Sequence, residues 1–157
     1  MSQRNVITLQ DNLQAALDLA KAGLKVFPVT PDKHPLVKWK TEATASPAKI
    51  RRFWRKWPDA MPAFATGDES GIDVLDLDRK DAKDGFKALA RLGIDPAGLS
   101  WVIVETASGG WHLYFARKPA LRCSVGQEKD GLAGVDVRAD RGFVVAPGAV
   151  NAKGRYS

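Results

Sequence analysis

Two carboxylates separated by a single residue stand out in the segment 71–78, which reads Gly-Ile-Asp-Val-Leu-Asp-Leu-Asp. Side chains alternate faces along a strand, so Asp76 and Asp78 share a face with their Cα atoms ~6.6–7 Å apart. Carboxylates this close repel each other, and a divalent cation removes the repulsion. Mg²⁺ and Mn²⁺ prefer oxygen ligands. Two such metal ions bound side by side can activate an attacking oxygen and stabilise a leaving one. The alternative is a strand running into an acidic turn, with Asp78 paired to Arg79 or Lys80.

A second candidate group is the segment Ser108-Gly109-Gly110, followed by His112. Two glycines let the backbone approach a ligand closely, and N–H groups exposed there can cradle a phosphate. A histidine on the next strand can donate a hydrogen bond to a phosphate oxygen. An ordinary Gly-Gly hairpin turn with a half-buried histidine fits the same residues. The segment is not a P-loop, because the Gly-Lys-Ser/Thr ending is absent.

A third candidate pair is Asp136 and Arg138, which alternate on the strand-like segment 134–138. If their face is the one that carries Asp76 and Asp78, Asp136 supplies a third carboxylate and Arg138 contacts an anion. A solvent-side ion pair between the two is the alternative interpretation.

The first half of the chain supplies two helices and a strand. We predict a helix over 9–22, capped by Thr8 and ended by Gly23, and then a strand over 24–29. A second helix begins at Ser46-Pro47, where a proline in the first turn costs little. Its apolar stripe has the spacing i, i+3, i+4, i+7 and consists of Ile50, Phe53, Trp54 and Trp57.

The second half of the chain is richer in strands. The pattern predicts a strand over 72–78, a helix over 82–92, a hairpin of 101–106 with 111–116, and a hairpin of 134–138 with 142–146. Helices and adjacent hairpins together indicate an α+β fold with a mostly antiparallel sheet. We find no linker, so we expect residues 1–157 to form a single domain.

The composition narrows the function classes. The 157 residues carry 24 basic and 18 acidic side chains, a net charge of +6, and a hydrophobic content of 45% excludes wholesale disorder. All of the excess positive charge lies in residues 1–60, which suggests an anionic partner. No segment is apolar enough for a membrane span or a signal peptide. The single cysteine, Cys123, excludes an internal disulfide, and we expect a cytoplasmic protein.

Two further segments are candidate contacts with nucleic acid or nucleotide. The basic, proline-punctuated loop 30–45 holds Lys38 and Trp39, and its lysines can track a phosphate backbone while the indole stacks on a base. A solvated loop anchored by Trp39 is an equal alternative. Thr66 and Gly67 precede the acidic strand and are candidates for lining a nucleotide pocket.

Together with their surroundings, these motifs resemble the primase–polymerase domain at the N-terminus of many phage and plasmid replication proteins, in the archaeo-eukaryotic primase superfamily. The likeness covers nearly the whole chain and rests on Asp76-Leu77-Asp78, Gly110-Trp111-His112 and Val135-Asp136, within stretches such as TASGGWHLYF and GVDVRADRGFVVAPG. Three positions depart from the usual pattern: Asp78 replaces a frequent Glu, and Ala107 and Gly148 each replace a Pro.

The resemblance implies an RRM-like catalytic core with flanking helices and a template-directed DNA primase/polymerase. It implies that Asp76, Asp78 and Asp136 bind two Mg²⁺ or Mn²⁺ ions and that His112 binds the triphosphate. It also implies that Ser108, Gly109 and Gly110 shape that loop and that Arg138 contacts phosphate. The partners would be single-stranded DNA template, primer, nucleoside triphosphates and a helicase in the same or another chain.

One cysteine and two histidines cannot build the zinc insertion of some relatives, so we expect no zinc. We also expect the chain to be the N-terminal part of a longer protein. A non-catalytic nucleic-acid-binding module of a replication helicase and a metal-dependent nuclease remain alternative functions.

Overall fold

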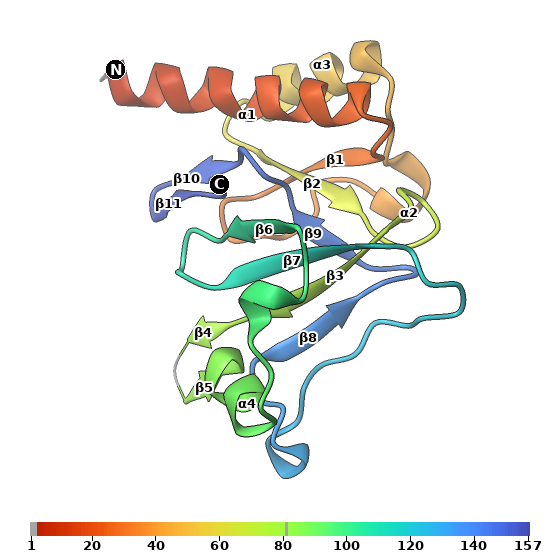
Figure 1. Cartoon of the computed structure of the whole chain (residues 1–157). Helices are drawn as coiled ribbons and strands as arrows, with labels where there is room; N and C mark the ends of the chain where they lie inside the picture. Colours follow the sequence, from red (N-terminus) through yellow and green to blue (C-terminus); the bar gives the residue numbers. More distant parts are fainter. Residues whose placement is uncertain (1–2, 81) are drawn as a thin grey trace. The chain divides into compact units, whose positions relative to one another are not determined.

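The computed structural model of the chain describes residues 3–80 and 82–157 and has the predicted α+β composition, with mostly antiparallel sheets (Figure 1). The chain forms two compact units. The first unit comprises the residues up to Ala65 together with Phe143–Ser157, and the second unit comprises Thr66–Gly142. That residues 1–157 act as one domain, and that the core is RRM-like, both stay predictions.

The first unit combines helices with a small antiparallel sheet in the order β1-β2-β9. Its helices α1 and α3 pack against each other, and α1 also packs on β2 and α3 on β1 (Figure 1). The elements are α1 (Gln3–Lys21), β1 (Val26–Val29), α2 (Trp39–Glu42), α3 (Pro47–Lys56), β2 (Met61–Ala65), β9 (Phe143–Val145), β10 (Val150–Asn151) and β11 (Gly154–Arg155).

The helix α3 follows its predicted apolar stripe. It starts with Pro47 in its first turn, and Ile50, Phe53 and Trp54 are buried. The indole N–H of Trp54 donates to the carbonyl of Ala60 (3.1 Å), so the one polar atom of this side chain is satisfied inside the core.

The first helix is longer than predicted, since α1 begins at Gln3 and Thr8 lies inside it rather than at its cap. Its buried face includes Asn12, whose amide donates to the carbonyl of Val150 (3.0 Å) and accepts from the Val150 N–H (2.8 Å). Side-chain amides that pair with a backbone in this way can be buried without an unsatisfied polar group.

The second unit is built on a four-stranded antiparallel sheet in the order β6-β7-β3-β8. A short hairpin and the helix α4 follow the central strand β3. The elements are β3 (Ile72–Leu77), β4 (Arg79–Lys80), β5 (Lys83–Asp84), α4 (Gly85–Arg91), β6 (Val102–Glu105), β7 (Trp111–Ala116) and β8 (Val135–Arg138), with single 3₁₀ turns at Pro96–Gly98 and Glu128–Asp130.

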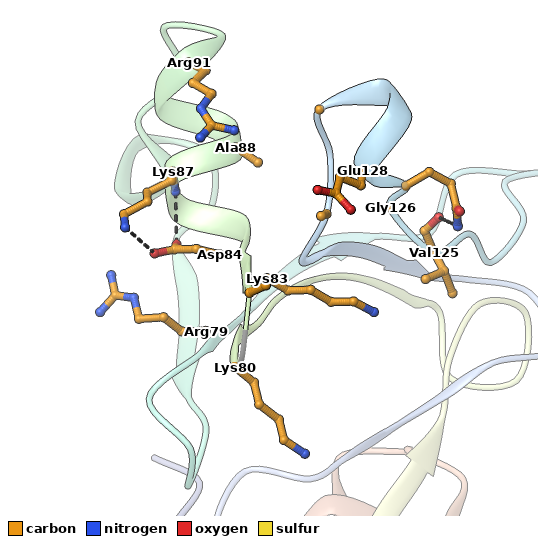
Figure 2. A pocket seen from close by; sticks show the side chains of 14 residues that line it. Arg79, Lys80, Lys83, Asp84, Lys87, Ala88, Arg91, Val125, Gly126 and Glu128 are labelled. Carbon is orange, nitrogen blue, oxygen red and sulfur yellow. Dashed lines mark hydrogen bonds and ion pairs between the residues drawn. The ribbon is translucent and has the colours of Figure 1, made fainter.

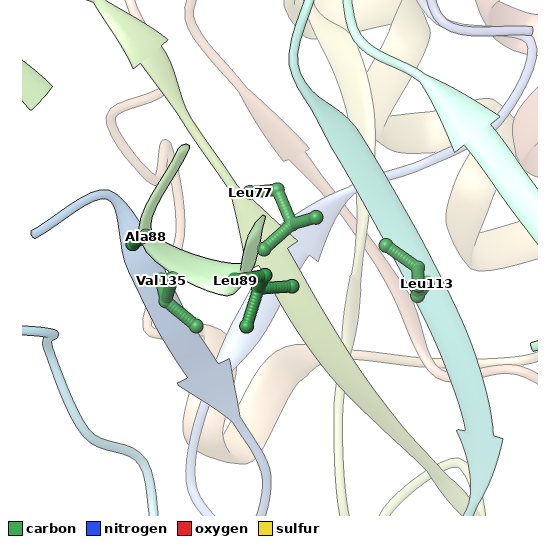
Figure 3. Packing of buried hydrophobic residues seen from close by; sticks show 5 residues of the cluster. All are labelled: Leu77, Ala88, Leu89, Leu113 and Val135. Atoms are coloured by element: carbon green, nitrogen blue, oxygen red, sulfur yellow. The ribbon is translucent and has the colours of Figure 1, made fainter. Parts of the chain in front are cut away.

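One face of this sheet carries the hydrophobic core of the unit. Leu77 of β3, Leu113 of β7 and Val135 of β8 pack with Ala88 and Leu89 of α4 (Figure 3). Alternation along β3 then sends the side chain of every second residue to the opposite face. In the described part of the chain, no helix is both long and apolar enough to cross a bilayer.

The helix predicted over 82–92 is shorter, because Lys83 and Asp84 pair with β4 instead. The Asp84 carboxylate accepts hydrogen bonds from the N–H groups of Phe86 and Lys87 (both 3.1 Å), so it caps the helix at this point.

The predicted hairpin of 134–138 with 142–146 is wrong. The strand β8 pairs with β3, whereas β9 belongs to the sheet of the first unit and pairs with β2. Between them, Arg141 has a positive φ of 64°, and the Asp140 carboxylate is held by Arg117 (3.1 and 3.2 Å) and by the N–H of Asp68 (2.9 Å). These contacts fix a turn that directs the chain away from β8.

Candidate active site

The centre of the site is Asp76 on the middle strand β3, with one partner on each side. The register places His112 of β7 directly opposite Asp76, and Asp136 of β8 opposite it on the other edge. Directly paired residues of neighbouring strands point to the same face, with Cβ atoms ~4.5–5.5 Å apart. The three side chains therefore stand in a row across the sheet, on the face away from α4.

Asp78 follows β3 immediately, and its backbone is held from two sides. Its N–H donates to the carbonyl of Gly134 (2.8 Å), and its carbonyl accepts from the N–H of Gly85 (2.9 Å). One carboxylate oxygen from each of Asp76, Asp78 and Asp136 lies within 4.8 Å of the other two. The structure thus brings together the three acids predicted as metal ligands.

The protein holds one carboxylate of this cluster, that of Asp136, with two hydrogen bonds. Arg138 donates from Nη2 to Oδ2 of Asp136 (2.9 Å), and the N–H of Gly126 donates to Oδ1 of the same carboxylate (3.1 Å). Asp136 is 8% exposed. Among the residues that the structure describes, no lysine or arginine forms an ion pair with Asp78. The alternative interpretation, in which Asp78 pairs with Arg79 or Lys80, is therefore not seen among these residues.

The donor set fits a divalent cation. Mg²⁺ and Mn²⁺ take oxygen ligands, and opposite ligands of Mg²⁺ lie ~4.2 Å apart at its ~2.1 Å bond length. Asp76, Asp78 and Asp136 offer carboxylate oxygens on nearly that scale. Three carboxylates this close repel one another, so a cation among them would relieve the repulsion.

His112 lies beside this cluster as a buried side chain, with Nε2 3.5 Å from Oδ1 of Asp76. Two residues further along β7, the phenol of Tyr114 shares the same face. Burial and then the negative charge of Asp76 raise the pKa of Tyr114, so its phenol stays protonated at ordinary pH. We did not single out Tyr114 from the sequence, although its i+2 spacing from His112 predicts the shared face.

The Ser108-Gly109-Gly110 segment forms the tight turn between β6 and β7, at the end of β3 that carries Asp78. A Cβ on Gly110 would lie 2.4 Å from the carbonyl oxygen of Leu77, so only glycine fits. The N–H groups of Gly109 and Gly110 both donate to Thr106, at 2.9 and 3.0 Å. A phosphate cradle made of these two N–H groups therefore requires the turn to open.

The remaining predicted contacts lie away from the carboxylates or in the first unit. Gly67 bridges to Ile72, and the Thr66 hydroxyl donates to the carbonyl of Ala139 (2.7 Å). Ile72 is the end of β3 opposite Asp78, ~13 Å from Asp76 at the usual rise per residue. Lys38 is exposed and belongs to the first unit, so its role stays a prediction.

Trp39 has a defined place inside the first unit. Its ring stacks on Phe27 (5.5 Å between centroids, 17° between planes) and meets Phe143 edge-on (5.2 Å). This packing favours the anchoring interpretation of Trp39 over base stacking.

Comparison with known proteins identifies the family. The profile of the bifunctional DNA primase/polymerase N-terminal domain matches residues 16–157, nearly the whole chain. A search of curated proteins found no match. The family match supports a DNA primase/polymerase type of function, with nucleotidyltransferase activity and with DNA and nucleotides as substrates. With three acids gathered beside a histidine and a profile that spans almost every residue, the chain belongs to the bifunctional DNA primase/polymerase N-terminal family.

Proposed function

We propose that the second unit catalyses template-directed nucleotidyl transfer from nucleoside triphosphates to the 3′-hydroxyl of a DNA primer or of a first nucleotide. The observation that carries this proposal is the convergence of Asp76, Asp78 and Asp136 next to His112. The membership of the chain in the primase/polymerase family supports it independently.

In the proposed reaction the 3′-oxygen attacks the α-phosphorus. A bond forms between the 3′-oxygen and the α-phosphorus, and the bond from the α-phosphorus to the oxygen bridging it to the β-phosphorus breaks. The hydroxyl proton passes to water, and pyrophosphate leaves. Asp76, Asp78 and Asp136 would hold two Mg²⁺ or Mn²⁺ ions, which when bound lower the pKa of the hydroxyl and neutralise the pyrophosphate.

The other residues of the face have separate roles in this proposal. Arg138 brings a positive charge next to Asp136 and contacts the triphosphate. His112 donates a hydrogen bond to a phosphate oxygen, and Tyr114 lies on the same face two residues further along β7. The turn of Ser108 closes the end of the site nearest Asp78.

Two alternatives and two sequence predictions stay open to test. A nuclease would use the same carboxylates to activate water, and a binding module would use none of them. A helicase partner and a cytoplasmic location stay predictions from the sequence.

The test is incubation of the chain with single-stranded template, labelled nucleotides and Mn²⁺, with and without primer. Products without primer indicate a primase, and extension alone indicates a polymerase. Asp76→Asn should abolish synthesis, whereas the control Asp130→Asn, an exposed acid of the same unit, should leave it unchanged. Strand cleavage, or synthesis that survives Asp76→Asn, would contradict the proposal.

Metal binding gives a second measurement that does not need turnover. Titration calorimetry with Mn²⁺ should show binding to the parent and to Asp130→Asn and a large loss in Asp76→Asn. Equal Mn²⁺ binding by all three proteins would show that the acidic cluster is not the metal site.

A further inference from the structure

A basic pocket of about 720 Å³ lies in the second unit, and one of its lining residues, Gly126, is hydrogen-bonded to Asp136 of the acidic cluster (Figure 2). One wall is formed by the β4–β5 hairpin and by α4. The hairpin begins at Arg79, the residue after Asp78. The other wall is the loop 125–133, whose Gly126 donates its N–H to Asp136. One wall therefore follows Asp78 in the sequence, and the other is hydrogen-bonded to Asp136.

The charge of this pocket is opposite to that of the acidic cluster. Among the described residues that line it, five are basic and two are acidic, Asp84 and Glu128. The Asp84 carboxylate already caps α4 and lies 3.9 Å from Nζ of Lys87. The basic residues are Arg79, Lys80, Lys83, Lys87 and Arg91.

Contacts within the second unit and the geometry of α4 set the positions of three of these cations, Arg79, Lys87 and Arg91. The guanidinium of Arg79 lies over the ring of Phe86 (4.0 Å), and this ring meets Trp111 edge-on (5.1 Å). A guanidinium stacked by its face still presents N–H donors in its plane. Lys87 and Arg91 are four residues apart on α4, and Figure 2 shows them following one another along the helix.

The residues that line the pocket favour the phosphates of a nucleic-acid strand over a free nucleotide as the bound anion. Small residues line the pocket together with the charged ones, and no aromatic ring lines it among the described residues. A free nucleotide needs a surface for its base, usually an aromatic one, whereas a strand held by its phosphates needs only spaced cations along a groove. The small residues are Ala82, Ala88, Gly126, Gly131 and Ala133.

We propose that this pocket binds the phosphate backbone of a single DNA strand as it leaves the carboxylate site, without reading its sequence. The inference rests on the proposed function, which brings DNA to Asp76, Asp78 and Asp136. The cations of the hairpin and of α4 would then hold the strand next to the reacting end.

The test is the salt dependence of DNA binding by the full chain, measured by fluorescence anisotropy with labelled oligo-dT in EDTA. Each lost phosphate contact on a single strand reduces the slope of log K against log salt by ~0.7. Lys80→Ala/Lys83→Ala/Lys87→Ala should therefore reduce the slope by about 2 and weaken binding about 100-fold at 0.1 M salt.

The matched control removes three exposed cations at the opposite end of the same sheet, Lys118→Ala/Arg122→Ala/Arg141→Ala, and should change the slope little. The charge-conserving variant Lys80→Arg/Lys83→Arg/Lys87→Arg should keep the slope of the parent protein. This variant replaces the alanine triple as the test if the alanine triple fails to fold. Equal losses in the pocket and control triples would mean that bulk charge, not the pocket, binds DNA. Unchanged DNA binding in the pocket triple, with loss of binding to a free triphosphate or to polyglutamate, would also overturn the inference.

The two proposals fail in different ways. Binding in EDTA needs no metal, so a parent protein that shows the pocket-dependent slope but makes no product would contradict only the proposed function. A parent that synthesises DNA while the pocket triple keeps the parent slope would contradict only the pocket.

Discussion

Gly134→Ala is the substitution that tests most directly how the fold places Asp78. Gly134 has a φ of +86°, and a Cβ there would lie 2.6 Å from the nitrogen of Gly85 and 3.1 Å from the carbonyl oxygen of Asp78. Those two atoms are hydrogen-bonded to each other (2.9 Å), and the Gly134 carbonyl accepts from the Asp78 N–H. The new methyl would enter the pair of bonds that holds the Asp78 backbone.

The expected effect follows from this geometry. An ordinary contact begins at 3.4 Å, so the methyl must push the Gly85 nitrogen away by about 0.8 Å. A displacement of ~1 Å at a catalytic group can cost ~10²-fold in rate. The left-handed backbone adds a cost of roughly 1–2 kcal/mol in stability for a residue with a Cβ. We therefore expect a large loss of synthesis and of Mn²⁺ affinity, with a smaller loss of stability.

Gly93→Ala is the matched control. Gly93 also has a positive φ, +70°, but a Cβ there would meet no atom within 4 Å beyond its chain neighbours. It should lose a similar ~1–2 kcal/mol in urea unfolding, while Mn²⁺ affinity and primer extension stay at the parent level. If Gly134→Ala matched Gly93→Ala in both Mn²⁺ affinity and rate, the contacts of Gly134 would not be what positions Asp78.

Three further outcomes are expected. His112→Asn should raise KM for the nucleotide about 10-fold or more, because a charge-assisted hydrogen bond to the triphosphate is lost. The affinity for Mn²⁺ without nucleotide should change little. An unchanged KM with a large loss of Mn²⁺ affinity would instead make His112 a metal-site residue. The hydrogen bond from Arg117 lowers the pKa of Asp140, so this carboxylate stabilises the fold above about pH 4 and the gain is lost as pH falls through the lowered folded pKa. Urea unfolding should thus lose stability less steeply in acid for Asp140→Asn than for the parent, and parallel curves would refute the assignment. Because burial and the Asp76 charge raise the pKa of Tyr114, tyrosinate absorbance should show that phenol titrating at lower pH in Asp76→Asn, and an unchanged titration would place the charge elsewhere.

Much of the site follows from local rules. Strand alternation predicts that Asp76 and Asp78 share a face, and alternation also links Asp136 with Arg138. The order of the strands, however, depends on pairings between residues far apart in the chain. That β7 and β8 both pair with β3, and that His112 and Asp136 stand opposite Asp76, is set by register, which a local pattern does not contain.

The wrong predictions have the same origin. The segment 142–146 has the apolar character of a strand in either sheet, and the turn before it has hairpin-like residues. The bonds of the Asp140 carboxylate to Arg117 and to the Asp68 N–H decide the direction of the chain, and both partners lie more than 20 positions away. Likewise, the start of α4 depends on the pairing of β4 with β5, which takes Lys83 and Asp84 out of the helix.

The two faces of β3 explain how three carboxylates can be held together in a small unit. Leu75 and Leu77 alternate with the acids and face the core that α4 covers, where the fully buried Leu77 contributes roughly 1.5–3 kcal/mol and the partly buried Leu75 contributes less. Burial on one face of the sheet therefore offsets carboxylate repulsion on the other face. Without the apolar face, the repulsion between the carboxylates would separate the strands that carry them. A metal ion would then find no preformed set of oxygen ligands. The apolar residues between the acids are thus as necessary to the site as the carboxylates themselves.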